Sequence, residues 1–137
     1  MYLPYVVGTG LSLGVALFAR RVGLDRDRAS YATLVIIVAS YYVLFAAVSG
    51  SVSTILMESI VMIGFCAVAV MGFKSSQWLL VMALAGHGIF DAFHGLVIAN
   101  TGMPPWWPAF CGAYDVGAAA ALAWFLRVSK LPVGVRS

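Results

Sequence analysis

Residues 78–100 read WLLVMALAGHGIFDAFHGLVIAN, a run of mainly apolar residues. The run is long enough to cross a lipid bilayer, because a membrane-spanning helix needs about 20 predominantly apolar residues. Its ionisable residues are His87, Asp91 and His94. We therefore predict a transmembrane helix here, one that carries polar groups in an apolar setting.

The rest of the chain has the same apolar character. Of its 137 residues, 63% are hydrophobic and 9% are charged, whereas about a quarter of the residues are charged in soluble domains. A water-soluble fold of this length cannot bury so much apolar surface. We predict an all-α membrane protein with short loops, in which residues 1–137 form one transmembrane domain. Five spans are expected, at residues 2–19, 29–49, 53–73, 78–100 and 109–128.

The basic residues predict the orientation of the chain in the membrane. They follow the first, third and fifth spans: Arg20, Arg21, Arg26, Arg28, Lys74, Arg127, Lys130 and Arg136. Because successive spans cross in opposite directions, all of these residues fall on one side. The positive-inside rule makes that side cytoplasmic, with the N-terminus outside and the C-terminus inside. Topology thus explains the net charge of +3, so we expect no nucleic-acid partner and place the protein in a bacterial cytoplasmic membrane.

The three ionisable residues of span 78–100 share one helix face. Positions i, i+4 and i+7 lie within about 60° of one another around a helix. A strip of small residues runs beside this face: Gly88, Ala92, Gly95 and Ala99. Small side chains let a neighbouring helix approach closely, so we predict that the polar face contacts protein.

Two further carboxyl groups lie inside other spans, Glu58 in the third and Asp115 in the fifth. An unpaired charge at the centre of a span costs about 2.5 to 3.5 kcal/mol on insertion scales. The cost is lower if the ionisable side chains of the three spans contact one another. The helical rise of about 1.5 Å per residue places Glu58, Asp115 and the polar residues of span 78–100 in one layer, which extends from His87 near the midplane into the outer half of the bilayer. Because the connector 101–108 is short, we predict that Asp91 and Asp115 are in contact.

The strings HGIFDAFHG (87–95) and PPWWPAFCGAYD (104–115) resemble motifs of a family of small, uncharacterised bacterial integral-membrane proteins. The resemblance covers the last third to half of the chain. It implies that His87, Asp91, His94 and Asp115 are the polar signature of that family, and it implies no particular activity. The residue types are also distantly similar to those of intramembrane zinc hydrolases, but this chain has two histidines where those enzymes use three.

Several functions fit these residues. A zinc or iron ion could be bound by Asp91, His94 and Asp115, with Glu58 as an auxiliary ligand. Since His87 and His94 are separated by about 10.5 Å of helix rise, one metal would take only one of them, and use of both would need two metals. With one metal, His87 would act as acid, base or supporting residue.

The second interpretation is metal-free acid–base chemistry on a lipid-like substrate. The alternatives are proton or cation translocation through the same residues and a polar network that only stabilises helix packing. We favour a membrane-embedded enzyme with Asp91, His94 and Asp115 at its centre.

Other residues are assigned structural roles. Cys66 and Cys111 lie at different depths and are predicted to be free thiols. Tyr41 and Tyr42 in the second span could reach the site or bond locally, and we expect local packing. Gly10 and Gly14 form a GxxxG pair that could support a homo-oligomer in the lipid bilayer, although such a pair more often packs within one chain.

Overall fold

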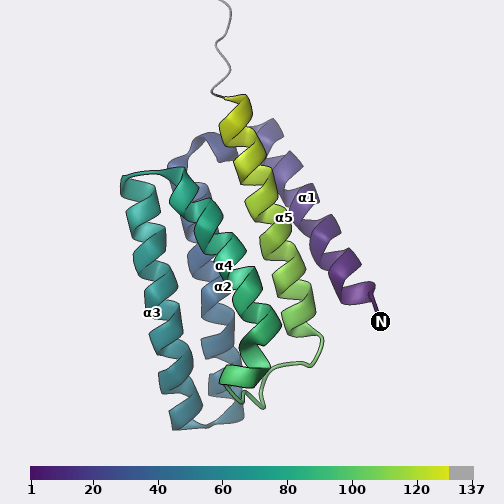
Figure 1. Ribbon diagram of the computed structural model, residues 1–137, viewed down its shortest axis with the longest axis vertical. Coiled ribbons are helices and arrows are strands. Elements are labelled where there is room, and N and C mark those ends of the chain that lie inside the picture. The colour runs from purple at the N-terminus through teal and green to yellow at the C-terminus, as the bar shows by residue number, and fades with distance from the viewer. Residues whose placement is uncertain (130–137) are drawn as a thin grey trace, which may run out of the picture.

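The computed structural model describes residues 1–129, and long α-helices account for most of that range (Figure 1). They are α1 (Leu3–Val22), α2 (Arg28–Ser49), α3 (Val52–Lys74), α4 (Gln77–Val97) and α5 (Trp107–Val128), with a short 3-10 helix, η1 (Leu24–Arg26), after α1. All 5 long helices have the length and composition to cross a membrane. The predicted fold class is therefore confirmed: the protein is an all-α integral membrane protein with five spans.

Local sequence explains why the helices start and end where they do. Polar side chains cap the N-termini of α2, α3 and α4, where Asp27, Ser51 and Ser76 each accept a hydrogen bond from a backbone N–H of the first turn. Gly23 and Gly50 follow α1 and α2 with φ angles of 84° and 72°. Glycine adopts this left-handed conformation without strain, which permits the short connections between helices.

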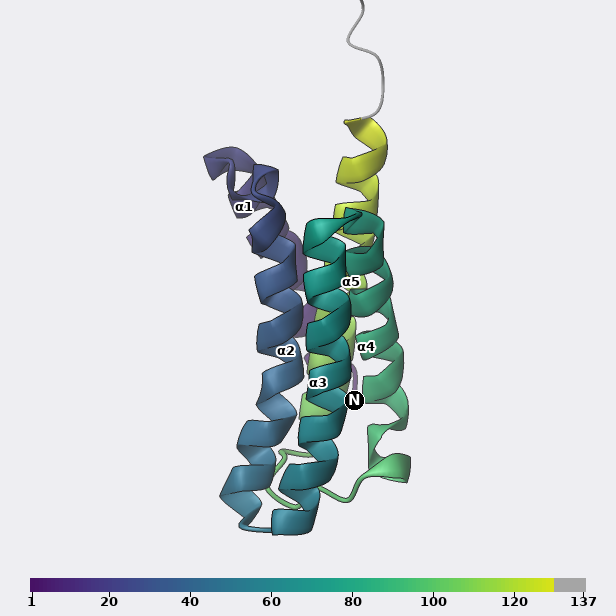
Figure 2. The same ribbon diagram turned by 90° about the vertical axis from the view of Figure 1, so that its left-hand side faces the viewer.

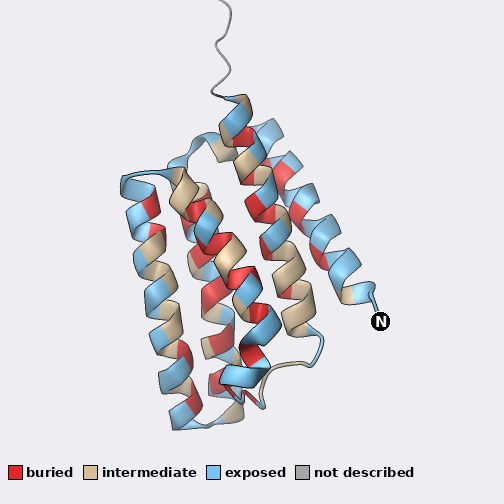
Figure 3. Cartoon of the chain, in the orientation of Figure 1, coloured by how far each residue is buried: buried red, intermediate tan, exposed pale blue. Residues whose placement is uncertain are grey.

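The helices form two groups that meet at α4. Helix α5 packs between α1 and α4, while α2 and α3 pack against each other and α3 also contacts α4. Figure 2 shows α2 and α3 side by side, with α1 on a different side of the bundle. Helices α4 and α5 have the largest buried share of their spans (Figure 3). The polar span 78–100 is thus at the centre of the bundle.

Large apolar side chains cover the outside of the bundle. Leu44, Ile60 and Leu96 are 55%, 70% and 85% exposed, which is the surface that lipid covers in a membrane. Gly10 and Gly14 also lie at this surface, with nothing within 4 Å of an added Cβ among the described residues. They therefore do not pack within the chain, and a homo-oligomer that uses them stays a prediction.

The basic residues within the described range gather at one end of the bundle, which we call the basic end. Arg28 of α2 donates a hydrogen bond to the backbone oxygen of Ser75 at the α3–α4 connection, at 2.9 Å. Arg20 of α1 lies 4.6 Å from the centre of the Phe125 ring of α5. The gathering of basic residues on one side, expected from the sequence, is therefore present among the described residues, whereas Lys130 and Arg136 lie outside them. That the basic end faces the cytoplasm remains a prediction.

An apolar core occupies the half of the bundle next to the basic end. Its largest members are fully or nearly fully buried: Tyr31, Val35, Leu80, Leu84 and Leu122. On α4 and α5 these residues lie on the basic-end side of His87 and Asp115. Polar side chains are therefore concentrated in the other half of the bundle.

Helix α4 ends at Val97, before the predicted end of its span at residue 100. The reason is Asn100, whose side chain turns into the bundle and donates hydrogen bonds to Tyr42 O at 3.0 Å and Glu58 Oε1 at 2.9 Å. Gly102 then lies against the backbone of α2, where an added Cβ would collide with Phe45 O. The α4–α5 connection is therefore folded onto the bundle.

Candidate functional site

The five ionisable residues predicted for the site are all buried. None is more than 2% exposed: Glu58, His87, Asp91, His94 and Asp115. The structure divides them into two neighbouring groups. The central cluster consists of His87, Asp91, Cys111 and Asp115, and the distal cluster consists of Glu58, His94 and Asn100.

The central cluster joins two side chains from each of two antiparallel helices. His87 and Asp91 are four residues apart on α4, and Cys111 and Asp115 are four residues apart on α5, so each pair lies on one helix face. His87 Nδ1 lies 2.6 Å from Asp115 Oδ2 and 3.6 Å from Asp91 Oδ2. Cys111 Sγ lies 3.9 Å from Asp115 Oδ2. The predicted meeting of Asp91 and Asp115 therefore occurs, with His87 between them.

Two glycines bring α4 and α5 close enough for this arrangement. A Cβ added to Gly88 would lie 3.1 Å from Gly112 O, and one added to Gly112 would lie 3.3 Å from Gly88 O. Close approach at Gly88 was expected from the strip of small residues. The strip does not contact a neighbouring helix along its whole length, because Gly95 has nothing within 4 Å of an added Cβ among the described residues.

Tyr42 of α2 connects the two clusters. Its hydroxyl group donates a short hydrogen bond to Asp91 Oδ1, and its ring stacks on the His94 ring with centroids 4.1 Å apart and an angle of 12°. The expectation that Tyr42 only packs locally is wrong. Nothing in the sequence distinguishes it from Tyr41, because the rotation of α2 about its own axis decides which tyrosine faces α4.

The distal cluster links α3, α4 and the α4–α5 connection. His94 Nε2 lies 2.7 Å from Glu58 Oε1, and the same oxygen accepts the hydrogen bond from Asn100. Nearby, Thr54 Oγ1 donates to Ala99 O at 3.3 Å. Sequence reasoning missed Asn100 because it placed residue 100 inside the fourth span, whereas the residue lies beyond the end of α4.

The structure therefore changes the membership of the predicted metal site. We expected His94 beside Asp91 and Asp115, but His94 pairs with Glu58, and His87 occupies the position between the two aspartates. Cys111, expected only to be a free thiol, is indeed free and joins the central cluster. In this cluster one potential ligand atom from each residue lies within 4.8 Å of all the others.

Asp91 borders a groove that we call the Asp91 groove. It lies between α4 and α5 near the start of α1 and has a volume of about 470 Å³. Small residues make up much of its lining: Gly88, Ala92, Gly112 and Ala113. At its edges, Tyr5 and Val116 are 53% and 54% exposed, so the groove opens on the lipid-covered surface.

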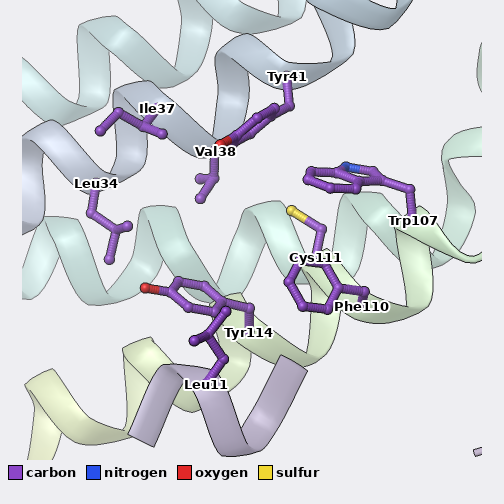
Figure 4. Close-up of a pocket in the computed structure, with 9 residues that line it drawn as sticks. All are labelled: Leu11, Leu34, Ile37, Val38, Tyr41, Trp107, Phe110, Cys111 and Tyr114. Atoms are coloured by element: carbon purple, nitrogen blue, oxygen red, sulfur yellow. The ribbon is translucent and has the colours of Figure 1, made fainter. Parts of the chain in front are cut away.

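Cys111 borders a second groove, of about 200 Å³, on the other side of α5. This Cys111 groove lies between α1, α2 and α5 and is lined mainly by apolar side chains, among them Leu34, Val38 and Trp107. Figure 4 shows the Cys111 sulfur pointing toward Val38, Tyr41 and Trp107. The central cluster thus lies between two hollows.

The fold and the site define a five-helix integral membrane protein with a buried cluster of one imidazole, two carboxyl groups and one thiol. Comparisons with known protein families, with functionally described proteins and with solved structures give no match to this chain. The likeness of residues 87–95 and 104–115 to small bacterial membrane proteins stays a prediction.

Proposed function

We propose that the protein is an enzyme of a bacterial cytoplasmic membrane that carries out acid–base chemistry on a lipid-like substrate. The observation that carries this proposal is the position of the central cluster beside the Asp91 groove. Ionisable residues inside membrane spans are functional candidates because they are costly to keep there. Here they lie beside an opening on the lipid-covered surface.

The geometry of the central cluster suits proton transfer. His87 is within hydrogen-bonding distance of Asp115, at 2.6 Å, and only 3.6 Å from Asp91. A proton can therefore pass directly between the imidazole and Asp115, while Asp91 lies just beyond hydrogen-bonding distance of the same nitrogen. Acid–base catalysis needs such a group within hydrogen-bonding reach of the substrate, and Asp91 borders the groove. The arrangement suits an isomerisation, a cyclisation or a hydrolysis.

The Asp91 groove favours a lipophilic substrate. Its volume of about 470 Å³ lies in the range of about 300 to 1,000 Å³ that is usual for ligand pockets. Alanine, glycine and proline residues form much of its wall, and Asp91 is its only acidic or basic residue among the described residues. The Asp91 side chain is fully buried beside this wall, so a molecule dissolved in the bilayer would reach its carboxyl group from the groove when α4 and α5 separate locally.

Translocation through Asp91, His94 and Asp115 is less well supported. A transport path needs polar groups in both halves of the membrane. In the part of the chain that the structure describes, the half next to the basic end is filled by the apolar core around Val35, Leu84 and Leu122. The polar clusters therefore suit a site that a substrate enters from the lipid bilayer better than they suit a transport pathway across the membrane within one chain.

Isotope labelling tests the proposed function on a whole mixture of lipids, so that no single substrate has to be chosen. The purified protein is reconstituted in vesicles of a bacterial lipid extract and incubated in D₂O or in H₂¹⁸O, with heat-inactivated protein as the control. We expect mass spectrometry to detect a lipid species that gains deuterium, or ¹⁸O for a hydrolysis, as incubation proceeds. The proposal fails if no lipid gains either label. Proton uptake by the vesicles without labelled lipid would favour translocation instead.

Filling the Asp91 groove tests the route of the substrate. A tryptophan at position 92 would occupy the groove without removing a member of the central cluster. We expect Ala92→Trp to slow lipid labelling by about 100-fold, because small displacements of a substrate cost this much. The matched control is Leu96→Trp, on the same helix, at a residue that is 85% exposed and outside the groove. Equal rates for the two variants would show that the substrate reaches the cluster by another route.

A further inference from the structure

We propose that the central cluster binds one zinc ion through His87, Asp91, Cys111 and Asp115. The inference deepens the proposed function and rests on it only for the use of the metal in catalysis. Zinc binding itself follows from the donor atoms and their geometry. It also differs from the site expected from the sequence, since His87 replaces His94 and a thiol is added.

The donor set matches the preferences of zinc. Zinc in proteins is bound by histidine nitrogen, cysteine sulfur and carboxylate oxygen, usually four in a tetrahedron. The central cluster offers one imidazole, one thiol and two carboxyl groups, all of them buried. A thiolate and an imidazole select zinc over magnesium or calcium, which prefer oxygen ligands.

All four donor atoms lie within 4.8 Å of one another, and two of the separations are close to those of a tetrahedral site. Ligands at zinc distances of about 2.0 to 2.3 Å lie roughly 3.3 to 3.8 Å from one another. His87 Nδ1 and Asp91 Oδ2 are 3.6 Å apart, and Cys111 Sγ and Asp115 Oδ2 are 3.9 Å apart. His87 Nδ1 and Asp115 Oδ2, at 2.6 Å, share a hydrogen bond. If zinc replaced the proton of this hydrogen bond, the distance between His87 Nδ1 and Asp115 Oδ2 would increase by about 1 Å.

A supporting hydrogen bond orients one of the carboxylate ligands. Ligating carboxylates usually accept a hydrogen bond from a neighbouring side chain, which fixes their direction. Tyr42 donates to Asp91 Oδ1. The other oxygen, Asp91 Oδ2, and also Asp115 Oδ1, have no hydrogen-bond partner among the described residues. Asp91 Oδ2, which lies 3.6 Å from His87 Nδ1, is thus a buried oxygen in the cluster that a cation can use.

Charge also favours a bound cation. Burying carboxylates away from water is costly unless a positive charge compensates them. The buried side chains of the described residues include neither lysine nor arginine. A divalent ion would balance Asp91 and Asp115, and metal binding would deprotonate the Cys111 thiol. Four protein ligands fill a tetrahedral zinc site, so in the proposed enzyme one carboxylate would leave the metal and give its position to a substrate oxygen or a water molecule beside the Asp91 groove. Zinc would then polarise that oxygen or activate that water.

Metal analysis of the purified protein is the first test. After incubation with excess Zn²⁺ and desalting, we expect one zinc per chain in the wild type and in the control Cys66→Ser, which changes the thiol that lies outside the cluster. We expect little zinc in Asp115→Asn. Tyr42→Phe should bind zinc about 10- to 100-fold more weakly, the usual effect of removing a hydrogen bond to a ligand. A folded wild type that takes up no zinc would overturn the inference.

Cobalt substitution identifies the ligands even where a variant keeps some metal. Bound Co²⁺ reports a thiolate ligand through a sulfur-to-metal absorption band in the near ultraviolet. We expect this band in the wild type and in Cys66→Ser, and expect Cys111→Ser to lose it while its circular dichroism stays that of a folded helical protein. A band that persists in Cys111→Ser would contradict the assignment. Labelled lipid without bound metal would refute the zinc site alone, and bound zinc without labelled lipid would refute the enzyme alone.

Discussion

Asparagine in place of Asp115 is expected to slow the labelling of lipid by about 10²- to 10⁴-fold, the usual contribution of a general acid or base. The asparagine side chain has nearly the shape of the aspartate and can still accept a hydrogen bond from His87. It cannot take up or release a proton. Since Asp115 is fully buried and lies 2.6 Å from His87 Nδ1, no water molecule can easily replace it in the proton transfer.

The rate is compared with that of Asp25→Asn, which makes the same chemical change at the basic end. Asp25 pairs with Arg20 at 3.1 Å and lies outside both clusters. Both variants should retain the helical circular dichroism of the wild type and melt within a few degrees of it. If Asp115→Asn labels lipid as fast as Asp25→Asn does, Asp115 is not part of the catalytic machinery.

Alanine in place of Glu58 is expected to lower the free energy of unfolding by about 2 kcal/mol. Glu58 Oε1 is the partner of both His94 and Asn100, which are 0% and 8% exposed. Its removal leaves His94 Nε2 and one of the two N–H groups of the Asn100 amide without a partner, since the other donates to Tyr42 O. Each unpaired group costs about 1 to 3 kcal/mol. Hydrogen bonds in membrane proteins average only about 0.6 kcal/mol, so the lower part of this range applies.

Glutamine at the same position separates loss of the charge from loss of the hydrogen bonds. Glu58→Gln keeps an oxygen acceptor for Asn100 and should cost less than about 1 kcal/mol. The control is Ser53→Ala, an exposed polar change earlier on α3. Unfolding in mixed detergent micelles gives the free energies. The folded fraction of Glu58→Gln should label lipid at the wild-type rate, because the distal cluster supports the fold. A labelling rate reduced by more than tenfold would show that Glu58 takes part in catalysis.

The sequence alone determined that this is a five-span membrane protein and that its five ionisable residues within the spans would be buried. The thickness of the bilayer sets the length of an apolar helix, and a bilayer-spanning backbone must satisfy its own hydrogen bonds. The rise per residue sets the depth of each polar group. With the short connection 101–108, these rules were enough to bring Asp91 and Asp115 together.

Only the tertiary structure decided how the polar groups are paired. His87 and His94 lie on the same face of α4, one on each side of Asp91, so spacing along the helix cannot tell which of them meets Asp115. The answer depends on where α5 crosses α4, which is set by the contact of Gly88 with Gly112. The rotation of each helix about its own axis then brings Tyr42 and Cys111 into the cluster. Rotation and crossing depend on how side chains of different helices pack, and the pattern within one helix does not contain that information.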